Sequence, residues 1–246
     1  MDFSNKKFRK LLNQSYEMIA DWYSNNLRGE KIYNNTTPNE IKKAFKINTR
    51  NKKKDPSEVI EHLKQNLIKH SNFNPRPNNY KYITEGGNQI EILAKYIKSA
   101  LNQNNLKCNG APANSEIEKI TIEWISEFIG YNHKKRGGVL VSGGSVANLM
   151  NIAVMRKIKG ESFLSKEGIY NNQKMRVYVS KEAHSSIDKA MDILGLGINN
   201  LIKIKTKNFK IDSKLLKEKI NKDIKEGYKP IGVIGIAGTT NTGSVD

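Results

Sequence analysis

The stretch Gly138-Val139-Leu140-Val141-Ser142-Gly143-Gly144-Ser145 decides the fold class. In it a short apolar run ends in a polar, glycine-rich turn, and an apolar-periodic helix follows from Val146. Apolar runs and helical periodicity then alternate along the rest of the chain. The predicted strands are 139–141, 176–179, 201–204 and 231–237, and the predicted helices between them are 146–155, 187–194 and 213–226. Strands that alternate with helices predict an α/β fold with a mostly parallel sheet covered on both faces.

The residues before this stretch favour helices. Apolar side chains between Phe8 and Trp22 share one helical face. Thr37-Pro38 is a cap residue followed by proline at the first helical position, and Asp55 and Glu58 have the spacing of a capping box. Two more helices are predicted, over 89–101 and, from a capping box at 115–118, to about 129. We therefore expect an all-helical N-terminal segment, residues 1–85, ahead of an α/β domain, residues 86–246.

The net charge first suggests a nucleic-acid partner. The 246 residues include 42 Lys and Arg against 24 Asp and Glu, a formal charge of +18. These basic residues are spread along the chain, with one tight cluster from Arg50 to Lys54 and no signature of a nucleic-acid-binding module. The composition fits AT-rich codons. We expect no specific nucleic-acid binding, and a basic surface that favours small anionic ligands.

Other function classes are excluded by the apolar and cysteine patterns. No apolar run approaches the ~18 residues that a membrane span needs, and the first ten residues do not resemble a signal peptide. A single cysteine, Cys108, excludes an internal disulfide framework and a cysteine-rich metal site. We expect a cytoplasmic protein with no membrane association and no metal site.

The most apolar strand, 231–237, is expected to be buried on both faces. Ligands of such sheets bind at the carboxyl ends of the strands, which directs attention to the loops 142–145, 181–185 and 238–244. In the first loop, glycines and a helix start favour an anion such as phosphate, and Ser145 adds a hydroxyl. The same loop could instead be a plain strand-to-helix turn with Ser145 as the N-cap.

The other two loops also have two interpretations. His184 could be a structural histidine, but at the end of a strand an imidazole can lie flat against a planar ligand or move a proton near neutral pH. The stretch 238–243 (GTTNTG) could form a hydrogen-bonding lip over a pocket or a polar turn.

Taken in order, six motifs resemble the group II decarboxylases that depend on pyridoxal phosphate, the aromatic-L-amino-acid, histidine and glutamate decarboxylase type. The motifs are His70-Ser71-Asn72-Phe73, residues 111–118 (APANSEIE), Trp124, residues 138–150, Ala183-His184-Ser185-Ser186 and Gly238-Thr239-Thr240. The resemblance covers nearly the whole chain. It implies the PLP-dependent transferase (type I aminotransferase) fold, with residues 86–246 as part of the large domain and residues 1–85 as a dimer-embracing segment.

The resemblance also implies roles for individual residues. It makes Gly143, Gly144 and Ser145 ligands of the phosphate of pyridoxal 5'-phosphate, and Thr240 a further cofactor contact. His184 would stack on the pyridine ring as a catalytic residue. Phe73 and Pro112 are weaker candidates for a substrate pocket, since each also suits ordinary packing. The implied substrate is an amino acid, with the aromatic-L-amino-acid type slightly favoured.

The sequence departs from the family pattern in two ways. Val146 stands where the family usually has glutamate or another polar residue. The family's Asp-x-Ala motif, which pairs with the pyridine nitrogen, and its His-Lys motif, whose lysine binds the cofactor covalently, lie beyond the Gly-Thr-Thr block. Neither occurs between that block and Asp246, and His133-Lys134 comes far too early, before the phosphate loop. We therefore expect the 246 residues alone not to decarboxylate an amino acid.

Several alternatives stay open from the sequence. The chain could work as a homodimer or with a complementing C-terminal half, as a subunit of a split enzyme. It could be a non-catalytic remnant that binds only the cofactor or a partner chain. Another enzyme of the same fold, similar to sphingosine-phosphate lyase or cysteine desulfurase, is the nearest enzymatic alternative, and a basic nucleic-acid-binding protein is the most distant one.

Overall fold

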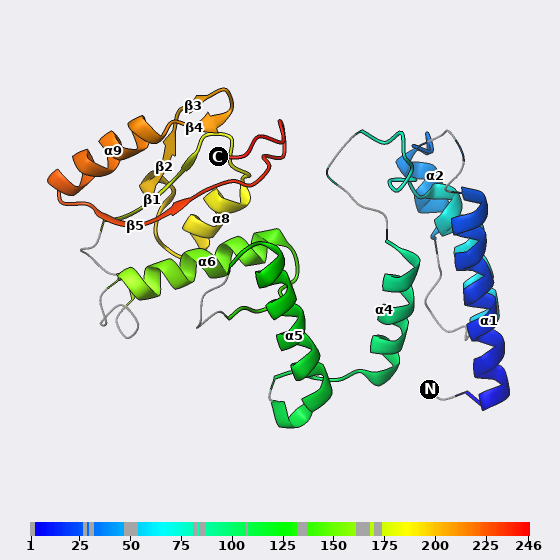
Figure 1. Cartoon of the computed structure of the whole chain (residues 1–246). Coiled ribbons are helices and arrows are strands. Elements are labelled where there is room, and N and C mark those ends of the chain that lie inside the picture. Colours follow the sequence, from blue (N-terminus) through cyan, green and yellow to red (C-terminus); the bar gives the residue numbers. More distant parts are fainter. Residues whose placement is uncertain are drawn as a thin grey trace. The chain divides into compact units, whose positions relative to one another are not determined.

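The computed structural model describes residues 3–26, 29, 32–46, 54–80, 83, 87–106, 108–131, 137–160, 168–169 and 174–246. The chain divides into two compact units, Met1–Asn102 and Gln103–Asp246 (Figure 1). Each unit is described by itself. The sequence-based boundary between residues 85 and 86 separates a segment expected to contact a second subunit from a domain expected to bind the cofactor. This boundary stays a prediction.

The first unit is helical, as the sequence predicts. Its elements are α1 (Asn5–Asp21) with the π-helical turn η1 (Trp22–Asn26), α2 (Pro38–Ala44), α3 (Pro56–Leu63) with the π-helical turn η2 (Lys64–Ile68), and α4 (Gln89–Leu101). Thr37 and Glu40 form a reciprocal capping box, and Asp55 accepts a hydrogen bond from Ser57 N. The cap residues chosen from the sequence therefore start α2 and α3.

Charged and aromatic contacts hold the first unit together. Lys7 Nζ lies 2.8 Å from Asp55 Oδ2, which ties α1 to the start of α3. The rings of Trp22 and Phe73 stack with centroids 5.1 Å apart, and the Arg76 guanidinium lies over the Phe73 ring at 4.0 Å from its centroid. These contacts fix the loop that follows η2 against the end of α1.

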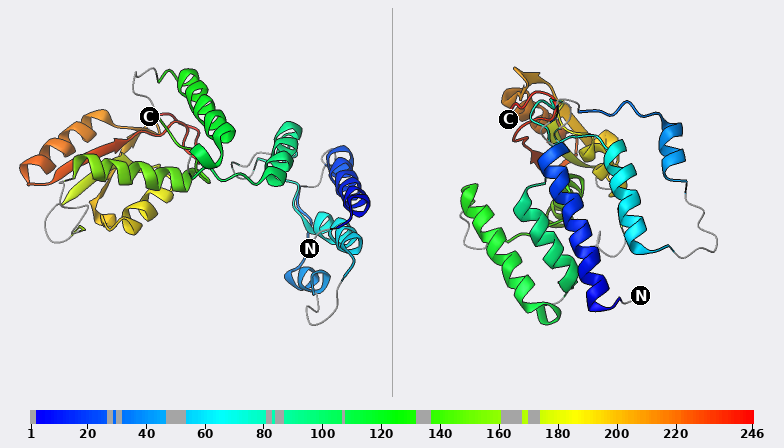
Figure 2. Two further views of the ribbon diagram at one scale, coloured as in Figure 1. Left: turned by 90° about the horizontal axis from the view of Figure 1, so that it is seen from below. Right: turned by 90° about the vertical axis from the view of Figure 1, so that its right-hand side faces the viewer.

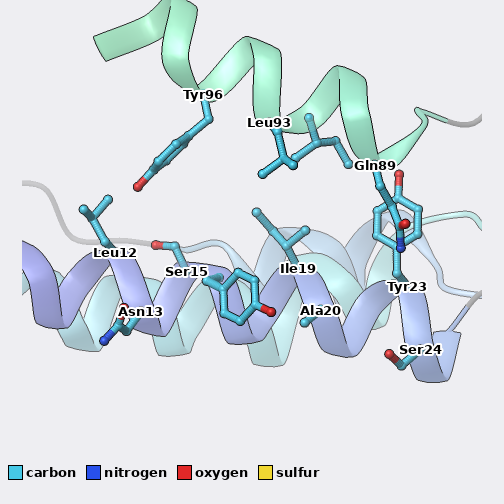
Figure 3. Close-up of a pocket in the computed structure, with 12 residues that line it drawn as sticks. Leu12, Asn13, Ser15, Ile19, Ala20, Tyr23, Ser24, Gln89, Leu93 and Tyr96 are labelled. Atoms are coloured by element: carbon cyan, nitrogen blue, oxygen red, sulfur yellow. The ribbon is translucent and has the colours of Figure 1, made fainter.

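A groove of about 690 Å³ lies between α1, η1 and α4 (Figure 3). Its walls are mainly apolar, with Ile19 of α1 and Leu93 of α4 on opposite sides, and the Tyr23 hydroxyl donates to the Gly87 carbonyl near one end. All of the residues that line it belong to the first unit. The groove has no counterpart in the sequence-based expectations.

The second unit has the predicted α/β order. Its elements are η3 (Cys108–Gly110), α5 (Pro112–Phe128), α6 (Gly144–Lys159), β1 (Met175–Ser180), α8 (Ser186–Ile193), η4 (Ile198–Asn200), β2 (Leu201–Ile204), β3 (Thr206–Lys207), β4 (Lys210–Ile211), α9 (Ser213–Lys225) and β5 (Lys229–Ile234). The main sheet has the order β2-β1-β5, and β1 pairs in parallel with both neighbours. Strands β3 and β4 form a short antiparallel ribbon. The predicted parallel α/β sheet is confirmed.

Strand β1 is buried along its whole length because helices cover both faces of the sheet. Met175, Val177 and Val179 belong to an apolar core with α6 and α8. Arg176 and Tyr178 contact Asp223 of α9 instead. Figure 2 shows α9 on one side of the sheet and α6 and α8 on the other.

Two local predictions are wrong. Residues 139–141 form no strand, and Val139 and Leu140 are each 55% exposed. A strand requires a neighbour for its backbone groups, and here Leu140 N donates instead to Glu118 Oε1 of α5. Helix α5 begins at Pro112 rather than Ser115, because proline is favoured at the first helical position.

The last predicted strand is shorter and less buried than expected. Strand β5 ends at Ile234, and Ala237 makes only an isolated bridge with Val245. Strand β5 lies at one edge of the three-stranded sheet. Ile231 belongs to the buried apolar core, whereas Val233, which pairs with Tyr178 after a register shift, is 46% exposed. An apolar composition therefore did not place this strand at the centre of the sheet. None of the helices in the described part of the chain has the length and apolar character needed to cross a membrane.

Candidate cofactor site

The loops that follow β1 and β5 lie at the same edge of the sheet because these strands run in parallel. The loop after β1 carries His184, and the loop after β5 carries Thr240. A hydrogen bond of 2.9 Å from Asn148 Nδ2 to Ser186 Oγ joins α6 to the start of α8. The structure thus brings the first two turns of α6 next to the His184 loop.

The start of α6 is open and carries no side-chain cap. Gly143 is the N-cap, with φ +82°, and the helix begins at Gly144, so the reading of Ser145 as the N-cap is wrong. A Cβ atom built on either glycine would meet nothing within 4 Å. The first N–H groups of a helix have no partner within the helix and carry its partial positive charge. Together with the exposed Ser145, they fit an anionic group such as a phosphate ester.

His184 is exposed, and its ring is held through Nδ1. Ser186 N donates to His184 Nδ1 at 3.2 Å, and Ser186 Oγ lies 2.9 Å from the same nitrogen. Ser186 is itself buried, with 4% of its surface exposed. The imidazole therefore satisfies an N–H group at the start of α8 that no helix carbonyl reaches.

The Gly238–Gly243 loop is closed by its own hydroxyl groups. Thr239 is buried, its Oγ1 lies 2.6 Å from Thr242 Oγ1, and its amide donates to the Ser244 carbonyl at 2.9 Å. Thr240 is exposed beside it. Asp246 braces the same region, since its carboxylate accepts hydrogen bonds from Ile211 N at 2.7 Å and Ile236 N at 3.0 Å. The loop thus holds Thr239 inside and leaves Thr240 outside.

The two substrate candidates lie in different units. Phe73 is 7% exposed and belongs to the first unit, between Trp22 and Arg76. Pro112 is exposed at the first position of α5 in the second unit. The packing role that the sequence allowed for Phe73 accounts for its contacts, and a substrate role for either residue stays a prediction.

Sequence reasoning missed Asn148 and Ser186. Ser186 is part of the Ala183–Ser186 motif, and Asn148 follows Gly144 by one helical turn, so each lay next to a chosen residue. Their hydrogen bond joins positions 38 residues apart, which no local pattern indicates. Among the described residues, no group of three or more His, Cys, Asp and Glu side chains is placed to hold a metal ion.

The geometry fits a ligand that carries a phosphate and a planar ring, and comparison with known proteins leads to the same class. The family described as "Pyridoxal-dependent decarboxylase conserved domain" matches residues 38–246. The chain therefore belongs to this family, whose cofactor is pyridoxal phosphate.

Curated relatives extend beyond the chain. The aromatic-L-amino-acid decarboxylase of Bacillus atrophaeus is 26% identical over 247 residues, covering 100% of this chain and 49% of the relative. The aspartate 1-decarboxylase of Aliivibrio fischeri is 29% identical over 213 residues, covering 77% of this chain and 39% of the relative. The chain spans about half the length of the curated relatives it matches.

Solved structures agree on the fold. Mouse CSAD matches with a TM-score of 0.90 at 21% identity, over 98% of this chain and 50% of that one. Oryza sativa TDC with PLP matches with a TM-score of 0.88 at 20% identity, over 100% and 54%. The predicted PLP-dependent transferase fold is confirmed by these similarities.

Proposed function

We propose that the chain forms the cofactor-binding part of a PLP-dependent amino-acid decarboxylase, a carboxy-lyase. One observation carries the proposal: Asn148, one turn after the open start of α6, donates to Ser186 Oγ, which in turn contacts the ring of His184. An anion site next to an oriented aromatic ring suits a ligand with a phosphate and a pyridine ring.

Each predicted cofactor-binding residue has a role in this proposal. The backbone N–H groups of Gly144 and Ser145, with the Ser145 hydroxyl, bind the phosphate, and Gly143, whose own N–H donates to the Val141 carbonyl, lets the backbone approach it closely. His184 packs its ring against the pyridine ring, and Thr240 offers a hydroxyl from the β5 loop. Bound pyridoxal phosphate supplies the electron sink for the carbanion that is left when carbon dioxide departs. The chain's own contribution is to bind and orient this group at the edge of the sheet.

For the substrate we propose an aromatic L-amino acid. The relative from Bacillus atrophaeus supports this choice, because its similarity extends over the whole chain. An acidic amino acid is the second candidate, favoured by the higher identity to the aspartate 1-decarboxylase of Aliivibrio fischeri. Carbon dioxide release from tyrosine, tryptophan, aspartate and glutamate, measured on the chain joined to or complemented by its C-terminal half, separates the two.

The assembly and location are also proposals. A homodimer, or a complementing C-terminal half, would cover the apolar groove between α1 and α4 with a second chain. The lone exposed Cys108 suits a reducing compartment such as the cytoplasm. The expectation that the 246 residues alone release no carbon dioxide stays a prediction, tested by the same assay on the purified chain.

Equilibrium binding of pyridoxal 5'-phosphate, followed by its absorbance, tests the proposal. The chain is expected to bind pyridoxal 5'-phosphate at least about tenfold more tightly than pyridoxal, which lacks the phosphate. Ser145→Ala should raise the Kd about tenfold, because it removes a hydrogen bond to a charged group. Ser213→Ala is the matched control, since Ser213 is an exposed serine at the start of α9. Equal affinity for the two ligands would contradict the phosphate site.

A further inference from the structure

Asn148 and Ser186 form a hydrogen-bonded connection from α6 to the ring of His184. Asn148 Nδ2 donates to Ser186 Oγ at 2.9 Å, and Ser186 Oγ lies 2.9 Å from His184 Nδ1. Asn148 is half-buried and Ser186 is buried. These two side chains lie outside the roles assigned above to the phosphate loop and the stacking ring.

The backbone decides which nitrogen of His184 carries the proton. Ser186 N–H points at His184 Nδ1 at 3.2 Å, so Nδ1 has to offer a lone pair. A proton on Nδ1 would face the proton of this amide. The neutral imidazole therefore carries its hydrogen on Nε2, the nitrogen that none of these contacts uses.

Asn148 decides the direction of the Ser186 hydroxyl. Because the Asn148 amide donates to Ser186 Oγ, the hydroxyl hydrogen is left to point at His184 Nδ1. Both donors of Ser186 then converge on one nitrogen. We propose that Asn148 is a positioning residue that acts through Ser186 to fix the rotamer of His184 and its Nε2–H tautomer.

The consequence is that one helix would set up both ends of the cofactor site. Helix α6 offers its N-terminus to the phosphate and, one turn later, uses Asn148 to orient the ring that stacks on the pyridine. The benefit of orienting His184 rests on the proposed function, because the ring is needed only if it stacks on the cofactor. The tautomer of His184, however, is a property of the chain without cofactor. It can therefore be tested separately.

The experiment is long-range ¹H–¹⁵N correlation NMR on the full chain labelled with ¹⁵N-histidine. The chain has four histidines, and His184→Gln identifies the signals of His184. Spectra are recorded at about pH 8.5, two units above the ordinary histidine pKa. We expect wild-type His184 to be the Nε2–H tautomer. Asn148→Ala and Ser186→Ala should each lower the ratio of Nε2–H to Nδ1–H about fivefold, the value of one ordinary hydrogen bond.

Two further variants sharpen the test. Asn148→Asp accepts the Ser186 hydroxyl hydrogen and turns it away from Nδ1, so it should lower the ratio at least as much as Asn148→Ala. Asn151→Ala is the matched control, because Asn151 is an exposed asparagine on the same helix, and it should leave the ratio unchanged. Unchanged circular dichroism shows that each variant is folded.

The outcomes distinguish this inference from the proposed function. An Nδ1–H tautomer in the wild type, or a ratio that stays at the wild-type value in folded Asn148→Ala, Asn148→Asp and Ser186→Ala, overturns the role of Asn148. Pyridoxal 5'-phosphate binding is measured on the same samples. A wild-type chain that shows the expected tautomer and its response to Asn148 but binds no pyridoxal 5'-phosphate contradicts the proposed function alone.

Discussion

The two faces of strand β1 are both buried, but opposite chemistry fills them. Met175, Val177 and Val179 face an apolar core made with α6 and α8. On the other face, Arg176 and Tyr178 converge on Asp223 of α9, which is fully buried. The packing of the first face depends on side chains of the right volume, and the packing of the second depends on paired charges. An error on the first leaves a cavity, whereas an error on the second leaves a buried charge without its partner.

Asp223 is the centre of the charged face. It accepts a hydrogen bond from the Tyr178 hydroxyl at 2.8 Å, forms an ion pair with Lys219 at 2.8 Å, and is also paired with Arg176, whose guanidinium lies over the Tyr228 ring. Burial alone would raise the pKa of Asp223, but the hydrogen bonds from Lys219, Arg176 and Tyr178 outweigh it and hold this pKa below its ordinary value. Burial and the contact with Asp223 raise the pKa of Tyr178.

The largest effect is expected on the charged face. Asp223→Ala should lower the free energy of unfolding of the second unit by about 3–5 kcal/mol, because it leaves Arg176 buried without its carboxylate. The measurement is hydrogen exchange of β1 peptides in increasing urea. Asp192→Ala, at an exposed aspartate of α8, is the control and should change stability by less than about 0.5 kcal/mol. Equal effects of the two variants would contradict a structural charge cluster.

The apolar face should respond through cavity formation. Ile152 of α6 is fully buried against β1, and Ile152→Ala should cost about 3 kcal/mol in the same exchange experiment. Ile158→Ala is matched in residue type and helix but starts from a side chain that is 69% exposed. A loss of stability for Ile158→Ala as large as that for Ile152→Ala would mean that the α6 face is assigned wrongly.

A smaller effect is expected where α6 approaches β5. A Cβ atom on Gly232 would lie 2.4 Å from Met155 Sδ, and because the flexible Met155 side chain can shift, Gly232→Ala should cost only about 1 kcal/mol through overpacking. Met155→Ala in the same chain should remove part of the Gly232→Ala penalty by making room. Gly235→Ala, where a Cβ atom meets nothing within 4 Å, is the control. A Gly232→Ala chain as stable as the Gly235→Ala control would contradict this close contact.

The smallest effect is expected from mild acid. Because the pKa of Asp223 is lower in the folded chain than in the unfolded one, its contribution is complete above about pH 5 and is lost only as the pH falls through its folded value. Exchange of β1 peptides should therefore show no Asp223-dependent change between pH 7 and about pH 5, and a loss below that range. Asp223→Asn should remove this acid-dependent part. A gain in stability as the pH falls from 7 to about 4, abolished by Asp223→Asn, would reverse the sign of the argument.

The faces of β1 also mark the limit of sequence reasoning about the fold. The local signals of Thr37 and Asp55 placed helix starts correctly, since a cap acts within one turn. The alternation over 176–179 identified a strand, but the partner of Tyr178 lies 45 residues away, and only the packed α9 reveals it. Residues 139–141 and 231–237 were judged by composition, whereas pairing and position in the sheet decided their structure.

The candidate site was predictable in its loops but not in its connections. The rule that ligands bind at the carboxyl ends of parallel strands led to the loops of His184 and Thr240, and glycine chemistry led to Gly143 and Gly144. The contact between Asn148 and Ser186 depends on how α6 packs on α8, so it required the structure. A hydrogen bond between two polar residues far apart in the sequence cannot be predicted from the residues next to either of them.

The most direct test of the cofactor site is a titration of the ¹⁵N-labelled chain with pyridoxal 5'-phosphate, followed by amide ¹H–¹⁵N correlation spectra. The site predicts that the largest chemical-shift changes fall on the amides of Gly144, Ser145, His184 and Thr240, with β2 and the outer face of α9 unaffected. Shifts that are absent at saturating cofactor, or that fall on residues elsewhere and spare the start of α6, would contradict it.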